Sequence, residues 1–162
     1  MQTFGKTQKI CVSGIVIAIY VVVMYFTQSF AFLQYQIRPA TGLYALSYLF
    51  PFLILPLGIS NSMSNMLFGG LGPFDVIGGF IAGILTSGSI YLVRRFGLSA
   101  LFVIPAIIFL PGLLVPLWLS PLLNVPYLIL APGICIGQIL PAVLGYLLIK
   151  ALPRAELFGG KI

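Results

Sequence analysis

An arginine between two long apolar runs is the first residue of this sequence whose chemistry suggests a binding site. Arg38 lies in the polar stretch 34–42, with Tyr35 before it and Thr41 after it. A guanidinium carries five donors in a fixed fork and could donate to a carbonyl or ring nitrogen of a small molecule. Tyr35 could stack on that molecule, with Thr41 as a further contact. The alternative is that Arg38 is an interfacial anchor that extends to lipid head groups.

Three side-chain amides lie inside apolar runs. Asn61 and Asn65 are four residues apart, so a helix would present both on one face. Gln138 is a single amide among apolar neighbours. Amides in a membrane are costly unless they are paired, so each could either line a ligand cavity or join two helices by hydrogen bonds.

The segment 69–75 contains three glycines, a proline and then Phe74 and Asp75. This composition predicts a tight turn that leads into a helix. Asp75 could satisfy the free N–H groups and the dipole at the helix N-terminus, or it could contact a ligand directly, with Phe74 as a second stacking surface. Trp118 and Tyr127 flank a later loop, where interfacial anchoring and ligand stacking are both open.

Several classes of function lack the residues they need. The only carboxylates are Asp75 and Glu156, and there is no histidine, so we expect no enzyme with a general base. Two cysteines are too few for a structural zinc site. No basic cluster is interleaved with aromatic residues, so we expect no nucleic acid as partner. Without a nucleotide-binding motif, we expect no cofactor in this chain, and ATP would have to be used by a partner subunit.

The elements that position these residues must be membrane helices. Of the 162 residues, 60% are hydrophobic and 6% charged, against roughly 25% charged in a soluble domain. A crossing helix needs about 20 residues, and the clear apolar runs are 10–30, 43–68, 73–93, 98–120 and 126–151. The sequence therefore predicts an all-α membrane protein with a single transmembrane domain, residues 1–162, and a first run retained as a span.

The run 43–68 leaves the number of spans open, because Pro51 could end one helix and start another. Six spans place seven of the eight basic residues on one side, and the positive-inside rule then puts both termini in the cytoplasm, with Arg38 on the outer side. We therefore predict a six-helix bundle in the plasma membrane. The second helix is too short to cross alone, at about 18 Å. The predicted helices are 10–30, 39–50, 51–68, 73–94, 98–118 and 127–151, with an irregular fifth helix because of its three prolines.

Small residues on the first predicted helix suggest a packing surface. Gly14 and Ala18 are four residues apart, and small residues at this spacing let two helices approach closely. The surface could face a partner protein or another helix of the same bundle.

Two segments of the sequence resemble a known family. Gln36-Ile37-Arg38, followed by a short helix and the asparagine-bearing helix, and then Leu67-Phe68-Gly69-Gly70-Leu71-Gly72-Pro73-Phe74-Asp75-Val76, are similar to the QueT-type queuosine-precursor transporters. These are substrate-binding (S) components of energy-coupling factor (ECF) importers. The resemblance implies a six-helix S component that binds a small molecule from outside and docks on a transmembrane coupling subunit, which carries two ATPase subunits.

The resemblance also implies roles for individual residues. The small-residue face of helix 1, here Gly14 and Ala18, would contact the coupling subunit. Family members tend to carry glutamates where this chain has Thr41 and Gln138, and a carboxylate suits the amine of a deazaguanine precursor. A neutral site implies queuine or a related deazaguanine, or another micronutrient such as a corrinoid. A stand-alone membrane carrier or pore is a further alternative.

Overall fold

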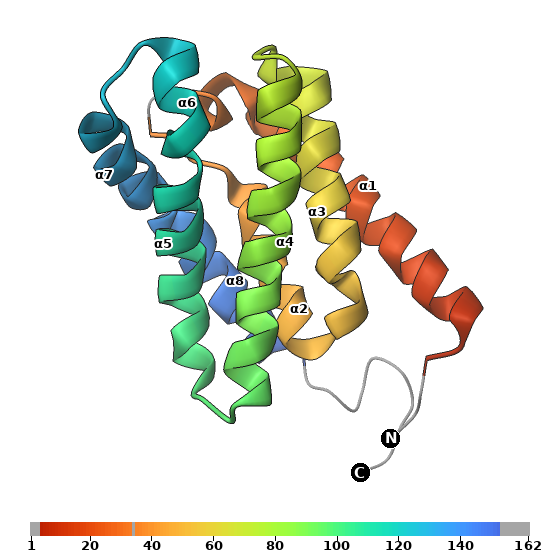
Figure 1. Ribbon diagram of the computed structural model, residues 1–162. Coiled ribbons are helices and arrows are strands. Elements are labelled where there is room, and N and C mark those ends of the chain that lie inside the picture. The colour runs from red at the N-terminus through yellow and green to blue at the C-terminus, as the bar shows by residue number, and fades with distance from the viewer. Residues whose placement is uncertain (1–3, 34, 153–162) are drawn as a thin grey trace.

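The computed structural model describes residues 4–33 and 35–152, and within them the chain is helical, with no strand. Figure 1 shows long helices packed side by side, with shorter elements between them. In chain order the elements are α1 Lys6–Ala31, η1 Pro39–Ala45, α2 Leu46–Leu49, η2 Pro51–Leu53, α3 Ile54–Ser64, η3 Asn65–Gly69, α4 Pro73–Arg95, η4 Ala100–Phe102, α5 Val103–Leu114, α6 Pro116–Leu123, α7 Tyr127–Gly137 and α8 Ile139–Ala151.

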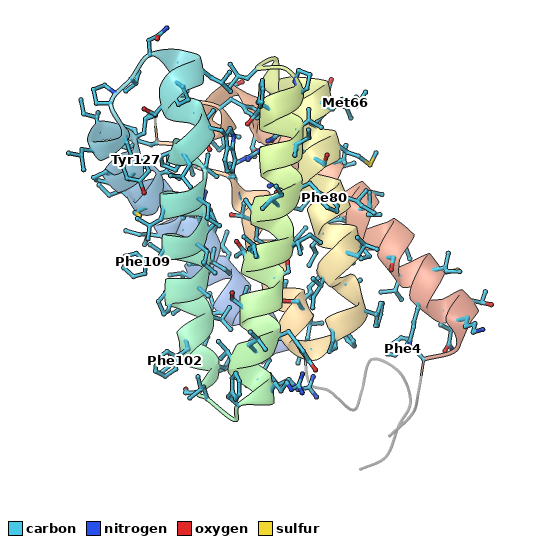
Figure 2. The ribbon with its side chains drawn as sticks, viewed as in Figure 1. Phe4, Met66, Phe80, Phe102, Phe109 and Tyr127 are labelled. Carbon is cyan, nitrogen blue, oxygen red and sulfur yellow. The ribbon has the colours of Figure 1, made fainter. Side chains whose placement is uncertain are left out.

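Five helical stretches in the described residues are long and apolar enough to cross a membrane. Large apolar side chains are exposed on the outside of the bundle, among them Met66, Phe102 and Phe109 (Figure 2). Polar side chains lie inside it instead, including Asn61 and Gln138. An apolar exterior, with the polar side chains kept inside a largely apolar core, is the arrangement that a bilayer favours. The chain is therefore a multi-pass helical membrane protein.

The ambiguous run 43–68 divides at Phe50, directly before Pro51, as the sequence predicts. The segment before the break forms η1 and α2 rather than one regular helix over 39–50. Gly42 lets η1 lie directly against α8, because a Cβ on Gly42 would be 2.8 Å from the Pro141 carbonyl oxygen. Five of the seven residues of η1 are buried, so this short element forms part of the interior of the bundle.

Contacts at its two ends give the direction of the segment 39–49. Just before η1, Arg38 donates to Asn65, and Asn65 in turn donates to the Asp75 carbonyl at the start of α4. At the other end, Arg94 near the end of α4 donates to the carbonyl oxygens of Tyr48 and Leu49, at 2.8 Å each. The segment therefore runs from the Asp75 end of α4 to its Arg94 end, parallel to that helix.

Prolines interrupt the last two predicted helices. The predicted helix 98–118 is irregular, as expected, and continues to Leu123 through a break at Val115, which divides α5 from α6. The predicted helix 127–151 divides at Gln138. Pro141 has no N–H to donate to the carbonyl four residues before it, which weakens the helix at Gly137. The break places Gln138 between α7 and α8. The first helix begins earlier than predicted, at Lys6.

Candidate functional site

Gln138 links the loop before η1 to the break between α7 and α8. Its Nε2 donates to the Gln36 carbonyl oxygen at 3.1 Å. Its Oε1 lies 2.6 Å from the hydroxyl of Thr41, which is also 2.7 Å from the Arg38 carbonyl oxygen. The hydroxyl has one proton and can donate it to one of these acceptors at a time. Two predicted site residues, Thr41 and Gln138, are thus in contact inside the bundle.

Arg38 is buried, with 4% of its surface exposed, so it lies inside the bundle rather than at the lipid interface. Its Nη2 donates to Asn65 Oδ1. Its guanidinium carbon lies 4.8 Å from the centre of the Phe32 ring, a cation–π distance. Its buried Nε has no hydrogen-bond partner among the described residues. A buried charged donor without a partner is costly and requires an explanation.

Asp75 is the acidic residue in the first turn of α4 and is buried, and among the described residues its carboxylate accepts no hydrogen bond from the backbone of that turn. Instead Asp75 Oδ1 accepts from Trp118 Nε1 at 3.1 Å. Gly78, one turn along α4, leaves room for this indole, because a Cβ there would lie 2.5 Å from Trp118. The carboxylate therefore ties α6 to α4, while Asn65 Nδ2 donates to the Asp75 carbonyl at 2.9 Å and ties η3 to the same turn.

Arg38 and Asp75 do not form an ion pair in the part of the chain that the structure describes; the Asn65 amide lies between them and contacts both residues. Separated buried charges are less stabilised than a direct pair. Arg38 and Asp75 each form hydrogen bonds to neutral groups instead. No carboxylate contact therefore neutralises the guanidinium among the described residues, and its charge can still attract an electron-rich ligand.

Asn61 lies further into the bundle and joins three elements. Its Nδ2 donates to the Gly79 carbonyl of α4 at 2.7 Å, and its Oδ1 accepts from the Tyr20 hydroxyl of α1 at 3.3 Å. The Tyr20 hydroxyl is also 3.2 Å from that of Tyr44 in η1. Asn61 and Asn65 therefore both join helices, which was one of their two expected roles; this role leaves ligand contact by either amide open.

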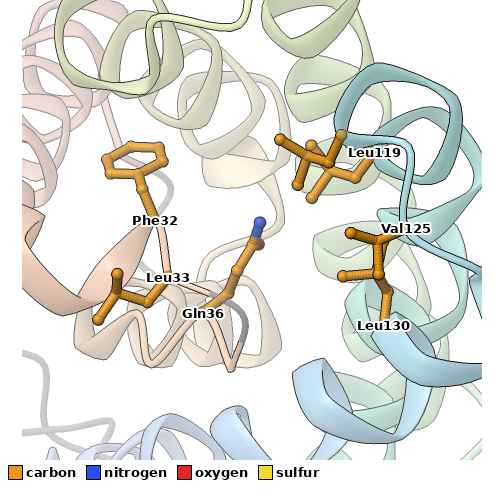
Figure 3. A pocket seen from close by; sticks show the side chains of 7 residues that line it. Phe32, Leu33, Gln36, Leu119, Val125 and Leu130 are labelled. Carbon is orange, nitrogen blue, oxygen red and sulfur yellow. The ribbon is translucent and has the colours of Figure 1, made fainter.

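A cavity of about 310 Å³ lies beside this polar cluster, between the chain that follows α1 and the helices α6 and α7 (Figure 3). Most of its lining is apolar, and Gln36 points into it from the loop before η1. The ring of Phe32 lines the cavity and also contacts the Arg38 guanidinium. The full lining is Phe32, Leu33, Gln36, Leu119, Leu123, Val125 and Leu130.

The two aromatic residues predicted to stack on a ligand lie elsewhere. Tyr35 is 52% exposed and Phe74 is 72% exposed, and neither lines the cavity. The backbone at Tyr35 packs tightly on α7, where a Cβ on Gly137 would collide with the Tyr35 carbonyl oxygen. Their stacking roles stay predictions. Gly14 and Ala18 are exposed on the outer face of α1, away from the polar cluster.

Sequence reasoning did not include Phe32 and Gln36 among the site residues, and it left Trp118 between two roles. Phe32 lies at the end of an apolar run, where nothing in the sequence tells an inward ring from an outward one. Gln36 lies in the polar stretch 34–42, and that position was a usable signal. The direction of its side chain depends on a backbone angle that the sequence does not indicate.

A cluster of hydrogen-bonded polar side chains, enclosed by membrane helices and next to an apolar cavity, defines a helical membrane protein with a candidate site for a small molecule. The family comparison is more specific. The chain belongs to the QueT transporter family, whose model matches residues 10–154. The resemblance found in the sequence is thereby confirmed, and the protein has a role in membrane transport. Comparisons with curated proteins and with solved structures gave no significant match.

Proposed function

We propose that this chain is the substrate-binding S component of an ECF-type importer and that it captures queuosine precursors, namely queuine or a related deazaguanine. The observation that carries the proposal is the buried Arg38, whose Nε has no partner among the described residues and whose guanidinium contacts a ring that lines the cavity. Family membership supports the transport role. A deazaguanine offers a carbonyl and ring nitrogens, which are acceptors for such a donor.

The size of the cavity supports a single fused-ring ligand. A volume of about 310 Å³ is at the lower end of the range of about 300–1,000 Å³ found for small-molecule sites. A flat bicyclic base suits it better than a corrin macrocycle, which is much larger. In the proposed complex Arg38 donates to a ligand acceptor, and Phe32 supplies a stacking surface. Thr41, Asn61, Asn65, Asp75 and Gln138 hold the surrounding backbone, and none of them is among the residues that line the cavity.

We also propose that the chain crosses the membrane six times, with the segment 39–49 as the second crossing. The start of α1 and the end of α8 would then both lie on the cytoplasmic side. The supporting contacts are those of Arg38 and Arg94 at opposite ends of that segment. In a variant without its native cysteines, a cysteine replacing Arg95 should resist a membrane-impermeant maleimide added outside intact cells. A cysteine replacing Phe74 should react. Labelling of position 95 from outside would refute this orientation.

The binding role is tested by measuring queuine affinity of the detergent-purified chain with Arg38 replaced by alanine. We expect Arg38→Ala to weaken binding at least about tenfold, because a charged hydrogen bond in a buried site is lost. Arg95→Ala is the matched control: it removes the same charge at an exposed position near the end of α4, and we expect unchanged affinity. Equal affinity of the wild type and Arg38→Ala would refute the site.

A further inference from the structure

Gln36 combines an unusual backbone with a side chain that has no partner of its own. It has a φ of 43°, in the left-handed region that residues other than glycine and asparagine rarely adopt. It is also 7% exposed, so more than nine-tenths of the residue is buried. Among the described residues its hydrogen bonds all involve its backbone, and none involves its side-chain amide. The residue is strained and largely buried, but its amide atoms are not among the fully buried side-chain atoms without a partner, so they remain accessible from the cavity.

Hydrogen bonds on both sides of the residue hold this backbone conformation. The Gln36 N–H donates to the Leu33 carbonyl at 2.9 Å, and the Gln36 carbonyl accepts from Gln138 Nε2 at 3.1 Å. The preceding carbonyl, that of Tyr35, packs against Gly137, where no Cβ would fit. The loop is thus fixed against the break between α7 and α8, and the conformation directs the Gln36 side chain into the cavity (Figure 3).

Within the cavity this amide is the one polar side chain of the lining; the other lining residues are Phe32 and five aliphatic residues. A primary amide offers one acceptor oxygen and two donor hydrogens, side by side in a plane. It matches a flat heterocycle that presents an adjacent acceptor and donor, as a lactam does with its C=O and ring N–H. The same bidentate geometry lets glutamine and asparagine read the edges of nucleobases.

We propose that Gln36 is the specificity-determining residue of the site and pairs through its amide with the lactam edge of a guanine-like base. This inference rests on the proposed function and deepens it, because it names the edge of the ligand that is read. The apolar remainder of the cavity receives the ring faces. A base that presents no donor beside its acceptor at this edge would leave the Gln36 amide only partly paired and would bind weakly.

The test compares two probes on the full-length purified chain: 7-deazaguanine, which has the lactam edge, and unsubstituted 7-deazapurine, whose corresponding edge offers one ring-nitrogen acceptor and no donor. We expect the wild type to bind 7-deazaguanine at least about tenfold more tightly than 7-deazapurine, since an amide left without its matching groups is penalised. Gln36→Gly should remove most of this preference and weaken 7-deazaguanine binding by at least about tenfold. Glycine tolerates the left-handed backbone conformation, so the melting temperature of the Gln36→Gly variant should not fall.

A second variant tests whether the effect of Gln36→Gly comes only from the lost side-chain volume. Gln36→Met keeps most of the side-chain volume but has no amide to donate or accept a hydrogen bond, and it should also weaken 7-deazaguanine binding at least about tenfold. If either variant retains the wild-type affinity and preference, Gln36 does not read the ligand and this inference is wrong, while the proposed function stands. If the wild type binds no deazaguanine, the proposed function fails and this inference fails with it.

Discussion

Polar side chains in this protein are paired mainly with backbone carbonyls and amides of neighbouring elements. Gln138 holds the Gln36 carbonyl and the Thr41 hydroxyl, Asn61 holds Gly79, and Asn65 holds Asp75. From the sequence, the amides Asn61, Asn65 and Gln138 were each expected either to line a ligand cavity or to join two helices, because a polar residue inside an apolar run must find a partner. The sequence did not indicate which partner, because that depends on how distant segments are packed.

Replacing Gln138 by leucine is expected to lower the free energy of unfolding by about 1–3 kcal/mol, because the Gln36 carbonyl would lose its partner inside the bundle. Thr41→Val should cost less, since the hydroxyl donates only one proton, either to the Arg38 carbonyl oxygen or to Gln138 Oε1. The double variant should cost less than the sum, because the two side chains are in contact. Thermal unfolding in detergent measures all three. Strictly additive effects would show that the Thr41–Gln138 contact contributes nothing.

The aromatic residues show the limit of residue-level prediction. In a soluble protein a large aromatic side chain is expected inside, but in a bilayer both the interior and the lipid are apolar. Tyr35 and Phe74 were expected to stack on a ligand, and both are exposed. Phe32, for which the sequence predicted no role, contacts Arg38 and lines the cavity. Composition cannot separate these cases, because hydrophobicity gives no direction in a membrane.

Among the elements, run length and proline position predicted most of the helices. The apolar runs correspond to the long helices, and Pro51 marks the division inside the run 43–68. Details that depend on tertiary packing were not predicted: η1 is a 3-10 element, and the last long helix is broken at Gln138. Nothing in the sequence indicates at which position a helix with several prolines breaks.

Close packing of α3 on α4 depends on two glycines that face each other. A Cβ on Gly83 would lie 2.8 Å from the Gly58 Cα and 3.2 Å from the Leu57 carbonyl oxygen. This backbone approach also brings Asn61 and Asn65 of the α3 region to α4, where they donate to carbonyls. Helix packing and the polar cluster are therefore coupled.

We expect Gly83→Leu to push α3 and α4 apart and to lower the free energy of unfolding by about 1–3 kcal/mol or more, since overpacked interiors lose about that much. Ligand affinity should fall as well. Gly88→Leu is the matched control on the same helix, because a Cβ at Gly88 has nothing within 4 Å. Melting temperatures in detergent would distinguish the two variants. Equal stability would show that the α3–α4 contact tolerates a large side chain.

At the scale of the whole molecule, the polar cluster and the surface on α1 are separate. Gly14 and Ala18 are exposed, and a Cβ at Gly14 would have nothing within 4 Å. Substitutions there can therefore alter docking without altering the bundle. This separation makes it possible to test the proposed partners, an ECF coupling subunit and two ATPase subunits, independently of ligand capture.

The variant with Gly14→Leu and Ala18→Leu is expected to keep its melting temperature and its queuine affinity but to lose co-purification with the coupling subunit and the ATPases. Large side chains would prevent the close helix approach that small residues allow. Pull-down of the tagged chain from its native membrane measures the association. Undiminished co-purification would exclude this face of α1 as the docking surface, and loss of queuine binding would show that the two surfaces are not independent.

The most direct test of small-molecule capture is mass spectrometry of the molecules released from the protein purified from its native host. We predict that the wild type releases a deazaguanine-type compound, in near-stoichiometric amount, and that Arg38→Ala purified in parallel releases much less of it. Arg95→Ala should release as much as the wild type. Release of no small molecule, or of equal amounts from the wild type and Arg38→Ala, would contradict the proposed capture of a queuosine precursor at this site.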